Sequence, residues 1–141
     1  MTLATWGPEG PWATPVYYAA DGFDLYFLSQ PSSRHAGNIA ARRRVAASVF
    51  DDPGGWREIR GVQLEGDAGP VPAASLPAAT GVYLERFPFV REFLGEGGSL
   101  LDGVFRVAGR LVRARLYLLR PVRVFYLDNC RGFGARVQIQ L

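Results

Sequence analysis

Short apolar runs, bounded by turns that contain glycine or proline, follow one another along most of this sequence. Turns such as Gly7–Gly10 and Ala19–Gly22 separate the first of them. Only two segments, 33–41 and about 78–87, are predicted to be helices. This order favours a mainly β fold with few helices, a small closed or split antiparallel barrel, over a sandwich or a doubly wound α/β fold. The predicted strands are 1–6, 12–18, 23–28, 44–50, 56–71, 111–118 and 122–127.

Glycine and proline positions refine this strand pattern. Gly61 and Gly66 fall within the longest predicted strand, where a bulge or a close backbone approach is expected. Pro121 has no N–H group to donate, so it is predicted to separate the last two strands. The glycine-rich stretch from Gly95 to about Gly109 is predicted to be flexible.

The composition constrains the size, the chemistry and the environment of the protein. Its 141 residues, 48% of them hydrophobic, fit a single domain, 1–141, with a substantial core. All sixteen basic side chains are arginine, which excludes Schiff-base chemistry on lysine, and the net charge of +3 suits small anions better than nucleic acid. The lone cysteine, Cys130, and the lack of a signal peptide or a spanning segment predict a cytoplasmic protein with no membrane partner.

The segment Ser29–Asn38 has the features of an anion site. Ser32 or Ser33 can cap the helix that begins there. Arg34 and His35 then lie in the first turn, where the helix dipole disfavours cations. Free N–H groups, hydroxyls, an arginine and a histidine at one helix start suit a bound anion, above all a phosphate. The alternative interpretation is a surface turn with two solvated basic residues.

Other polar residues near these segments are further candidates. Asn38 lies one helical turn after Arg34, so the two share a face and either converge on a ligand or form an ordinary exposed pair. His35 is the sole histidine, and no serine elbow or partner acid marks a catalytic triad. Gln63 is a polar residue on a strand rich in core-forming side chains, so we expect it to border a pocket; otherwise it faces water. No Cys/His spacing suggests a metal site.

Six motifs occur in an order and spacing that are more specific than any one of them. They are Leu-Ala-Thr (3–5), Gly-Pro-Trp-Ala-Thr-Pro-Val-Tyr-Tyr (10–18), Leu-Tyr-Phe-Leu-Ser (25–29), Ser-Arg-His-Ala-Gly-Asn (33–38), Arg-Val-Ala-Ala-Ser-Val (44–49) and Arg-Gly-Val-Gln-Leu-Glu-Gly (60–66). Together they resemble the FMN-binding split barrel, the superfamily of pyridoxamine 5′-phosphate oxidase. The tail 128–134, with Arg86-Phe-Pro88, is similar to an uncharacterised bacterial branch of it. The resemblance covers nearly the whole chain.

This resemblance implies a six-stranded antiparallel split barrel that forms a homodimer, with two FMN sites at the dimer interface. Gly61 and Gln63 would approach the flavin ring or the ribityl chain, and Asn129, Phe133 and Arg136 would reach the site of the partner subunit. Asn38 joins the cofactor-binding group by its place on the helix. The ring would lie against Thr14, Pro15, Val16 and Tyr17, and the phosphate would contact Leu28, Ser29, Ser33, Arg34 and His35.

The sequence also departs from the pattern of the oxidase. The basic pair at the phosphate is Arg34-His35 here, so phosphate binding is expected to depend on pH near the histidine pKa. Thr14 stands where the oxidase has an arginine. The residues that bind pyridoxal phosphate near the C-terminus have no counterpart, which argues against that substrate.

These observations predict an FMN-binding protein, a flavin-dependent oxidoreductase of unknown small-molecule substrate and electron donor. In such an enzyme the flavin carries the redox chemistry, so the lack of an acid/base cluster is expected. One alternative is a split barrel that binds deazaflavin, haem or no cofactor. Another is a small β-barrel that binds single-stranded nucleic acid through arginines and aromatic side chains.

Overall fold

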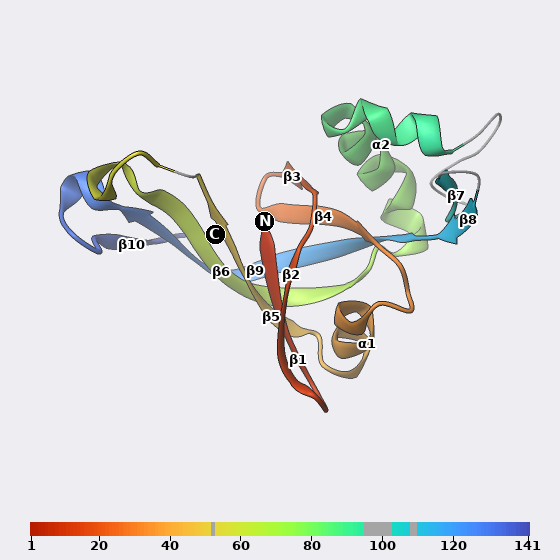
Figure 1. Ribbon diagram of the computed structural model, residues 1–141, viewed down its shortest axis with the longest axis horizontal. Coiled ribbons are helices and arrows are strands. Elements are labelled where there is room, and N and C mark those ends of the chain that lie inside the picture. The colour runs from red at the N-terminus through yellow and green to blue at the C-terminus, as the bar shows by residue number, and fades with distance from the viewer. Residues whose placement is uncertain (52, 95–102, 108–109) are drawn as a thin grey trace.

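The computed structural model describes residues 1–51, 53–94, 103–107 and 110–141 (Figure 1). Antiparallel strands dominate the described chain and two α-helices accompany them, which confirms the expected mainly β class. The helices are α1 (Arg34–Ala41) and α2 (Leu76–Arg86). The strands are β1 (Thr2–Gly7), β2 (Gly10–Pro15), β3 (Tyr18–Asp21), β4 (Asp24–Ser29), β5 (Arg44–Phe50), β6 (Arg60–Pro70), β7 (Val104–Val107), β8 (Arg110–Arg113), β9 (Arg115–Asp128) and β10 (Arg136–Ile139).

One large antiparallel sheet organises the molecule. Its strands run in the order β2-β1-β5-β6-β9-β4-β3, and β10 pairs with β9 as an eighth strand. The sheet therefore has eight strands and not six. Two reasons account for this: the predicted strand 12–18 is interrupted at Val16 and Tyr17, which splits it into β2 and β3, and the short β10 was not predicted. The strands β7 and β8 form a separate hairpin.

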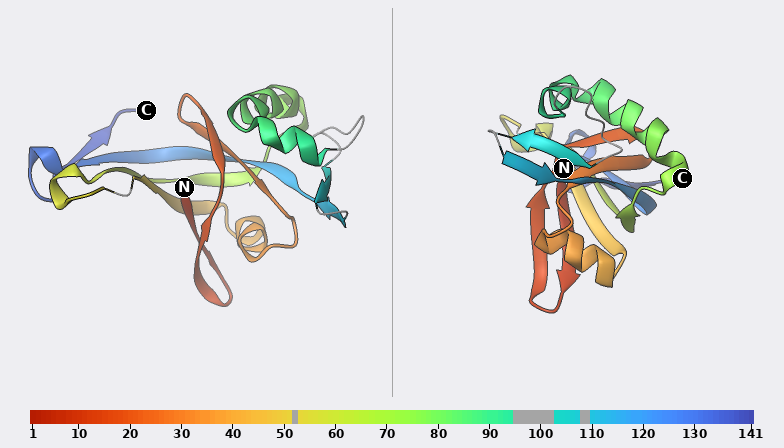
Figure 2. Two further views of the ribbon diagram at one scale, coloured as in Figure 1. Left: turned by 45° about the horizontal axis from the view of Figure 1, so that its top comes forward. Right: turned by 90° about the vertical axis from the view of Figure 1, so that its right-hand side faces the viewer.

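The curled sheet encloses the main hydrophobic core. Leu3, Phe27 and Leu119 from three strands are fully buried there, and the rings of Phe27 and Tyr117 stack with centroids 5.4 Å apart. Helix α1 covers part of this core with Ala36 and Ile39. The right-hand view of Figure 2 shows α1 beside the projecting β1–β2 hairpin. Burial of apolar side chains of this size contributes roughly 1.5–3 kcal/mol each.

A second layer packs on the outside of the sheet over β3, β4 and β9. It consists of α2, the 3₁₀ helix Pro88–Phe93 and the β7–β8 hairpin, which gather at one end of the molecule (Figures 1 and 2). Tyr26 and Leu116 of the sheet contact Tyr83 and Phe105 of this layer in a second buried cluster. Leu25 and Phe27 of β4 thus face the main core, and Tyr26 and Leu28 face the second layer.

The outside of β2, β1, β5 and β6 carries no such layer among the described residues. The strand register aligns one row of side chains there, which we call the outer row: Pro15, Thr2, Ser48, Gln63 and Phe125. These residues lie on the side of the sheet opposite Leu3, Ala47, Leu64 and Val124, which are buried in the core.

The prediction that Pro121 separates two strands is wrong, because β9 continues through it. The register between β6 and β9 shifts at Glu65/Gly66, and Pro121 lies opposite this irregularity, where its missing N–H group is tolerated. The expected bulge or close approach at Gly66 is confirmed: a Cβ there would overlap the carbonyl oxygen of Arg120 and lie 2.8 Å from Cα of Pro121. Gly61 also lies close to its neighbour, since a Cβ would be 2.9 Å from the carbonyl oxygen of Val49.

Other segments differ in detail from the predicted ones. The strand expected from residue 56 begins at Arg60, and Trp56–Glu58 is a 3₁₀ helix. Part of the stretch expected to be flexible, 95–109, forms β7, while 95–102 and 108–109 lie outside the described residues. The two predicted helices are confirmed within a few residues.

Candidate functional site

The predicted anion site is a compact polar cluster at the start of α1. Ser29 ends β4 and Ser33 caps the helix, its Oγ accepting from the N–H group of Ala36 at 3.3 Å. His35 Nε2 lies 2.6 Å from Ser29 Oγ and 3.2 Å from Ser33 Oγ, and the two hydroxyl oxygens are 2.9 Å apart. We call Ser29, Ser33 and His35 the serine–histidine cluster.

Burial sets the charge of this cluster. The histidine is about nine-tenths buried, and desolvation lowers the pKa of His35 below its ordinary value of 6.5. The imidazole is therefore neutral at pH 7, and in the tautomer with its proton on Nδ1 its Nε2 accepts from Ser29 Oγ. In the imidazolium Nε2 donates to Ser29 Oγ, whose hydroxyl then donates to the carbonyl oxygen of Gln30, 3.2 Å away, or to a ligand. Protonation of His35 thus changes the direction of its hydrogen bond with Ser29.

Arg34 does not point into the serine–histidine cluster. Its guanidinium donates to the carbonyl oxygen of Glu9 at 3.0 Å, lies 3.3 Å from the carboxylate of Glu9, and covers the ring of Trp12 at 4.4 Å. These contacts attach the start of α1 to the β1–β2 hairpin. A ligand that recruited Arg34 would have to compete with all of them.

Asn38 also contacts the hairpin. It is buried, and its Nδ2 donates to Thr5 Oγ1 at 3.0 Å. Its Oδ1 occupies the space that a side chain at Gly7 would need. Arg34 and Asn38 do share a helix face, as expected, but in this structure that face packs against β1 and β2.

Arg115 is a cation beside the cluster that sequence reasoning did not single out for this role. It pairs directly with Ser29 in the β4–β9 register, and opposite residues in antiparallel strands lie on one face. Its positive charge acts on the Tyr117 hydroxyl two residues away, opposing the rise in the pKa of Tyr117 that burial causes. Arg115 is exposed, and none of the ion pairs within the described residues includes it.

An aromatic pocket adjoins Ser29 on the side of the second layer. Tyr17, Leu28 and Ser29 line this cavity of about 290 Å³ together with Tyr83 and Phe89. Tyr17 is exposed and makes edge contacts with Phe89 and its neighbour Phe87 at 6.0 and 5.4 Å. The structure therefore brings three of the predicted cofactor residues, Tyr17, Leu28 and Ser29, to one cavity.

The other predicted residues near β2 point in two directions. Thr14 lies opposite the buried Leu3, and its Oγ1 is buried without a hydrogen-bond partner in the described structure. Val16 packs against the same core, and its backbone pairs with that of Met1. Pro15 and Tyr17, in contrast, are exposed. The side chains available to a ligand along this segment are thus those of Pro15 and Tyr17.

Gly61 and Gln63 lie on β6, away from the serine–histidine cluster. Gln63 is exposed and belongs to the outer row, so the strand register places it on the same face as Pro15, with Thr2 and Ser48 between them. Thr2 and Ser48 were missed by sequence reasoning because only the strand order reveals that they adjoin Pro15 and Gln63.

Asn129 and Phe133 lie in the arm formed by the ends of β6, β9 and β10, which extends to the left in Figure 1. Asn129 is buried and structural: it donates to the carbonyl oxygen of Trp56 at 2.8 Å and accepts from the N–H group of Gly134 at 3.0 Å. Phe133 is 86% exposed, and its ring makes an edge contact with Trp56 in this arm. Arg136, at the start of β10, is exposed.

The described residues contain no group of three His, Cys, Asp or Glu side chains that could hold a metal ion. None of their helices is both long enough and apolar enough to cross a membrane.

The fold and the motifs together define the class of this protein. The family model for pyridoxamine 5′-phosphate oxidase matches residues 1–88, more than half of the chain. The protein belongs to this family, and the expected resemblance is confirmed. Its curated relatives include a UPF0306 protein of Citrobacter koseri, 26% identical, and UPF0306 protein YhbP of Salmonella paratyphi B, 27% identical. Both alignments cover 89% of this chain, and they cover 75% and 74% of the relatives.

Solved structures of similar fold support the split-barrel architecture. A heme binding protein from Mycobacterium smegmatis has a TM-score of 0.73 and 21% identity over 99% of this chain, which spans about half, 51%, of that protein. A FAD-binding protein from Mesorhizobium loti has a TM-score of 0.64 and 19% identity, with 87% of this chain and 80% of that one covered. HutZ, the heme storage protein from Vibrio cholerae, has a TM-score of 0.61 and 20% identity, with 85% and 79% covered. At these identities the likeness establishes the fold.

Proposed function

We propose that this protein binds FMN and is a flavin-dependent oxidoreductase that acts on a small molecule. The observation that carries the proposal is the serine–histidine cluster at the start of α1, with Arg115 beside it in the strand register. Membership of the pyridoxamine 5′-phosphate oxidase family and the existence of a FAD-binding protein of the same fold are consistent with it.

The residues present fit a phosphate monoester. Ser29 and Ser33 offer hydroxyl donors, the first turn of α1 offers N–H groups without intrahelical partners, and Arg115 offers a charged donor. An arginine with no carboxylate partner in the described structure gives up no ion pair when it binds a phosphate. Arg34 would have to leave Glu9 before it could bind the phosphate, so we assign the main positive charge at the phosphate site to Arg115.

The surface from Ser29 to the outer row fits the rest of the cofactor. Leu28 and Tyr17 line one cavity with Ser29. Tyr17 is two residues from Pro15 in the chain, and Pro15 belongs to the outer row. A flavin bound there supplies the redox chemistry, and the protein residues hold and orient it. Exposed Pro15 and Tyr17 offer apolar contact to a ring, and Gln63 offers an amide within the outer row.

A second copy of the chain is the proposed partner. The outer row and its surroundings form an exposed sheet face that contains Ala4, Ala13 and Ala46, small residues that permit close packing of another sheet. A dimer built on this face would cover Gln63 and would bring the arm with Phe133 to the partner subunit. The exposed ring of Phe133 would then be buried.

Reconstitution tests the proposal directly. Purified protein is incubated with FMN and desalted, and its visible absorbance and its mass in solution are measured. We expect a retained flavin band, about one FMN per chain, and a dimeric mass. A Soret band in the protein as purified would show that the cofactor is haem and not FMN. A colourless protein after desalting would contradict tight flavin binding.

FMN binding should strengthen as the pH falls from 8 towards 6.5. Without ligand, burial holds the pKa of His35 below 6.5, whereas a phosphate beside the ring favours the imidazolium and raises the pKa. The complex therefore binds more protons than the free protein over this range, and linkage makes affinity rise as the pH falls. The check is a fluorescence titration with FMN at several pH values. His35→Gln should flatten the profile, and an unchanged slope in this variant would contradict the assignment.

A further inference from the structure

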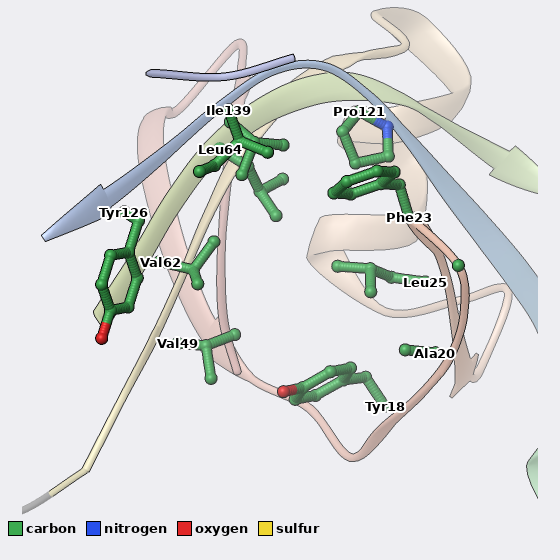
Figure 3. Close-up of a pocket in the computed structure, with 12 residues that line it drawn as sticks. Tyr18, Ala20, Phe23, Leu25, Val49, Val62, Leu64, Pro121, Tyr126 and Ile139 are labelled. Carbon is green, nitrogen blue, oxygen red and sulfur yellow. The ribbon is translucent and has the colours of Figure 1, made fainter. Parts of the chain in front are cut away.

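A second cavity opens into the main core, apart from the proposed flavin surface. It has a volume of about 290 Å³ and is lined by residues of β3, the β3–β4 turn, β4, β5, β6, β9 and β10 (Figure 3). We call it the barrel-mouth pocket and define it by Tyr18, Phe23, Val49, Val62, Tyr126 and Ile139. The sheet curls around it, so its walls face one another across the opening.

The chemistry of this lining selects the kind of occupant. None of its residues is charged, and the polar side-chain atoms are the two phenol oxygens of Tyr18 and Tyr126. Figure 3 shows both oxygens directed towards the side of the pocket that Val49 lines. An apolar cavity of this kind holds water poorly and favours an apolar molecule. A charged ligand would lose its hydration without gaining an ion pair.

The shape of the pocket favours a small molecule over a protein surface. The cavity is close to the lower size limit of small-molecule sites and matches one or two rings. The exposed outer face, on the other side of the sheet, is the surface suited to packing against another sheet. A second copy packed there would leave the inside of the curl open.

We infer that the barrel-mouth pocket binds a small, neutral, largely apolar ring compound, with a polar substituent directed at Tyr18 or Tyr126. This site is separate from the flavin surface, because Tyr17 and Tyr18 are successive residues that point to opposite sides of the sheet: Tyr17 packs against Phe87 and Phe89, and Tyr18 against the main core. The inference therefore does not rest on flavin binding.

The test uses N-phenyl-1-naphthylamine, a neutral dye that fluoresces in apolar surroundings. We expect saturable binding of about one dye per chain, weakened ~10-fold or more by Val49→Trp, which fills the pocket, and by Ile139→Arg, which charges it. Val122→Trp is the matched control, since Val122 is exposed and does not line the pocket. Circular dichroism identifies any variant that fails to fold.

A conservative variant covers the case in which both substitutions disrupt folding. Tyr126→Phe keeps the ring and removes one hydroxyl, so it should reduce the preference for 2-naphthol over naphthalene in dye competition.

The inference is overturned if the wild type shows no saturable binding, or if folded Val49→Trp and Ile139→Arg bind the dye as the wild type does. If dye binding falls as the protein concentration rises, and if Ile139→Arg is monomeric where the wild type is not, the pocket is a self-association surface instead. An unchanged 2-naphthol preference in Tyr126→Phe, with Tyr18→Phe also unchanged, would overturn the role of the phenols.

Discussion

Ser29→Ala should weaken FMN binding by roughly 10- to 100-fold and leave riboflavin binding nearly unchanged, because hydrogen bonds to charged groups contribute about 1.5–3 kcal/mol. The two ligands differ only in the phosphate, so their affinities separate a phosphate contact from a general loss of structure. The substitution also deprives His35 of its closest partner, 2.6 Å away, and some loss of stability is expected with it. Fluorescence quenching of both flavins measures the effect.

One control variant and a comparison of two arginine variants make the Ser29 test specific. Ser32→Ala changes an exposed serine in the same loop and should leave FMN affinity within about twofold, since surface substitutions are usually near neutral. Arg115→Gln should reduce FMN affinity more than Arg34→Ala, because Arg34 is engaged by Glu9 and Trp12. The reverse order would show that Arg34 leaves the hairpin to bind the phosphate.

Gly66→Ala should destabilise the fold by roughly 2–4 kcal/mol. A Cβ at this position overlaps the backbone of Arg120 and Pro121, and backbone atoms cannot rotate away as a flexible side chain can. Urea denaturation followed by circular dichroism measures the change. Gly37→Ala is the matched control: this glycine lies in α1 with open space around it, so alanine should stabilise by about 0.5–1 kcal/mol. Equal stabilities of the two variants would contradict the close approach of β6 and β9.

What the sequence predicted well was local. The cap at Ser33 and helix α1 depend on neighbouring residues, so the serine–histidine cluster followed from a few positions of sequence. Gly66, too, correctly predicted a bulge or close approach at its own position. The prediction that Pro121 separates two strands was wrong because the register shift that accommodates the proline lies on β6, a neighbouring strand, and not in the sequence around Pro121.

What the sequence missed depends on tertiary pairing. The partners of Arg34 and Asn38 come from the β1–β2 hairpin, far from α1 in the chain, and no local pattern indicates them. Arg115 adjoins Ser29 only through the β4–β9 register. Thr2 and Ser48 join Pro15 and Gln63 only through the order of four strands.

The ratio of FMN to riboflavin affinity in the wild-type protein at pH 7 tests the central claim most directly. A phosphate held by Ser29, Ser33 and Arg115 predicts that FMN binds at least ~10-fold more tightly than riboflavin. Equal affinities, or no measurable binding of either flavin, would contradict a phosphate site at the start of α1.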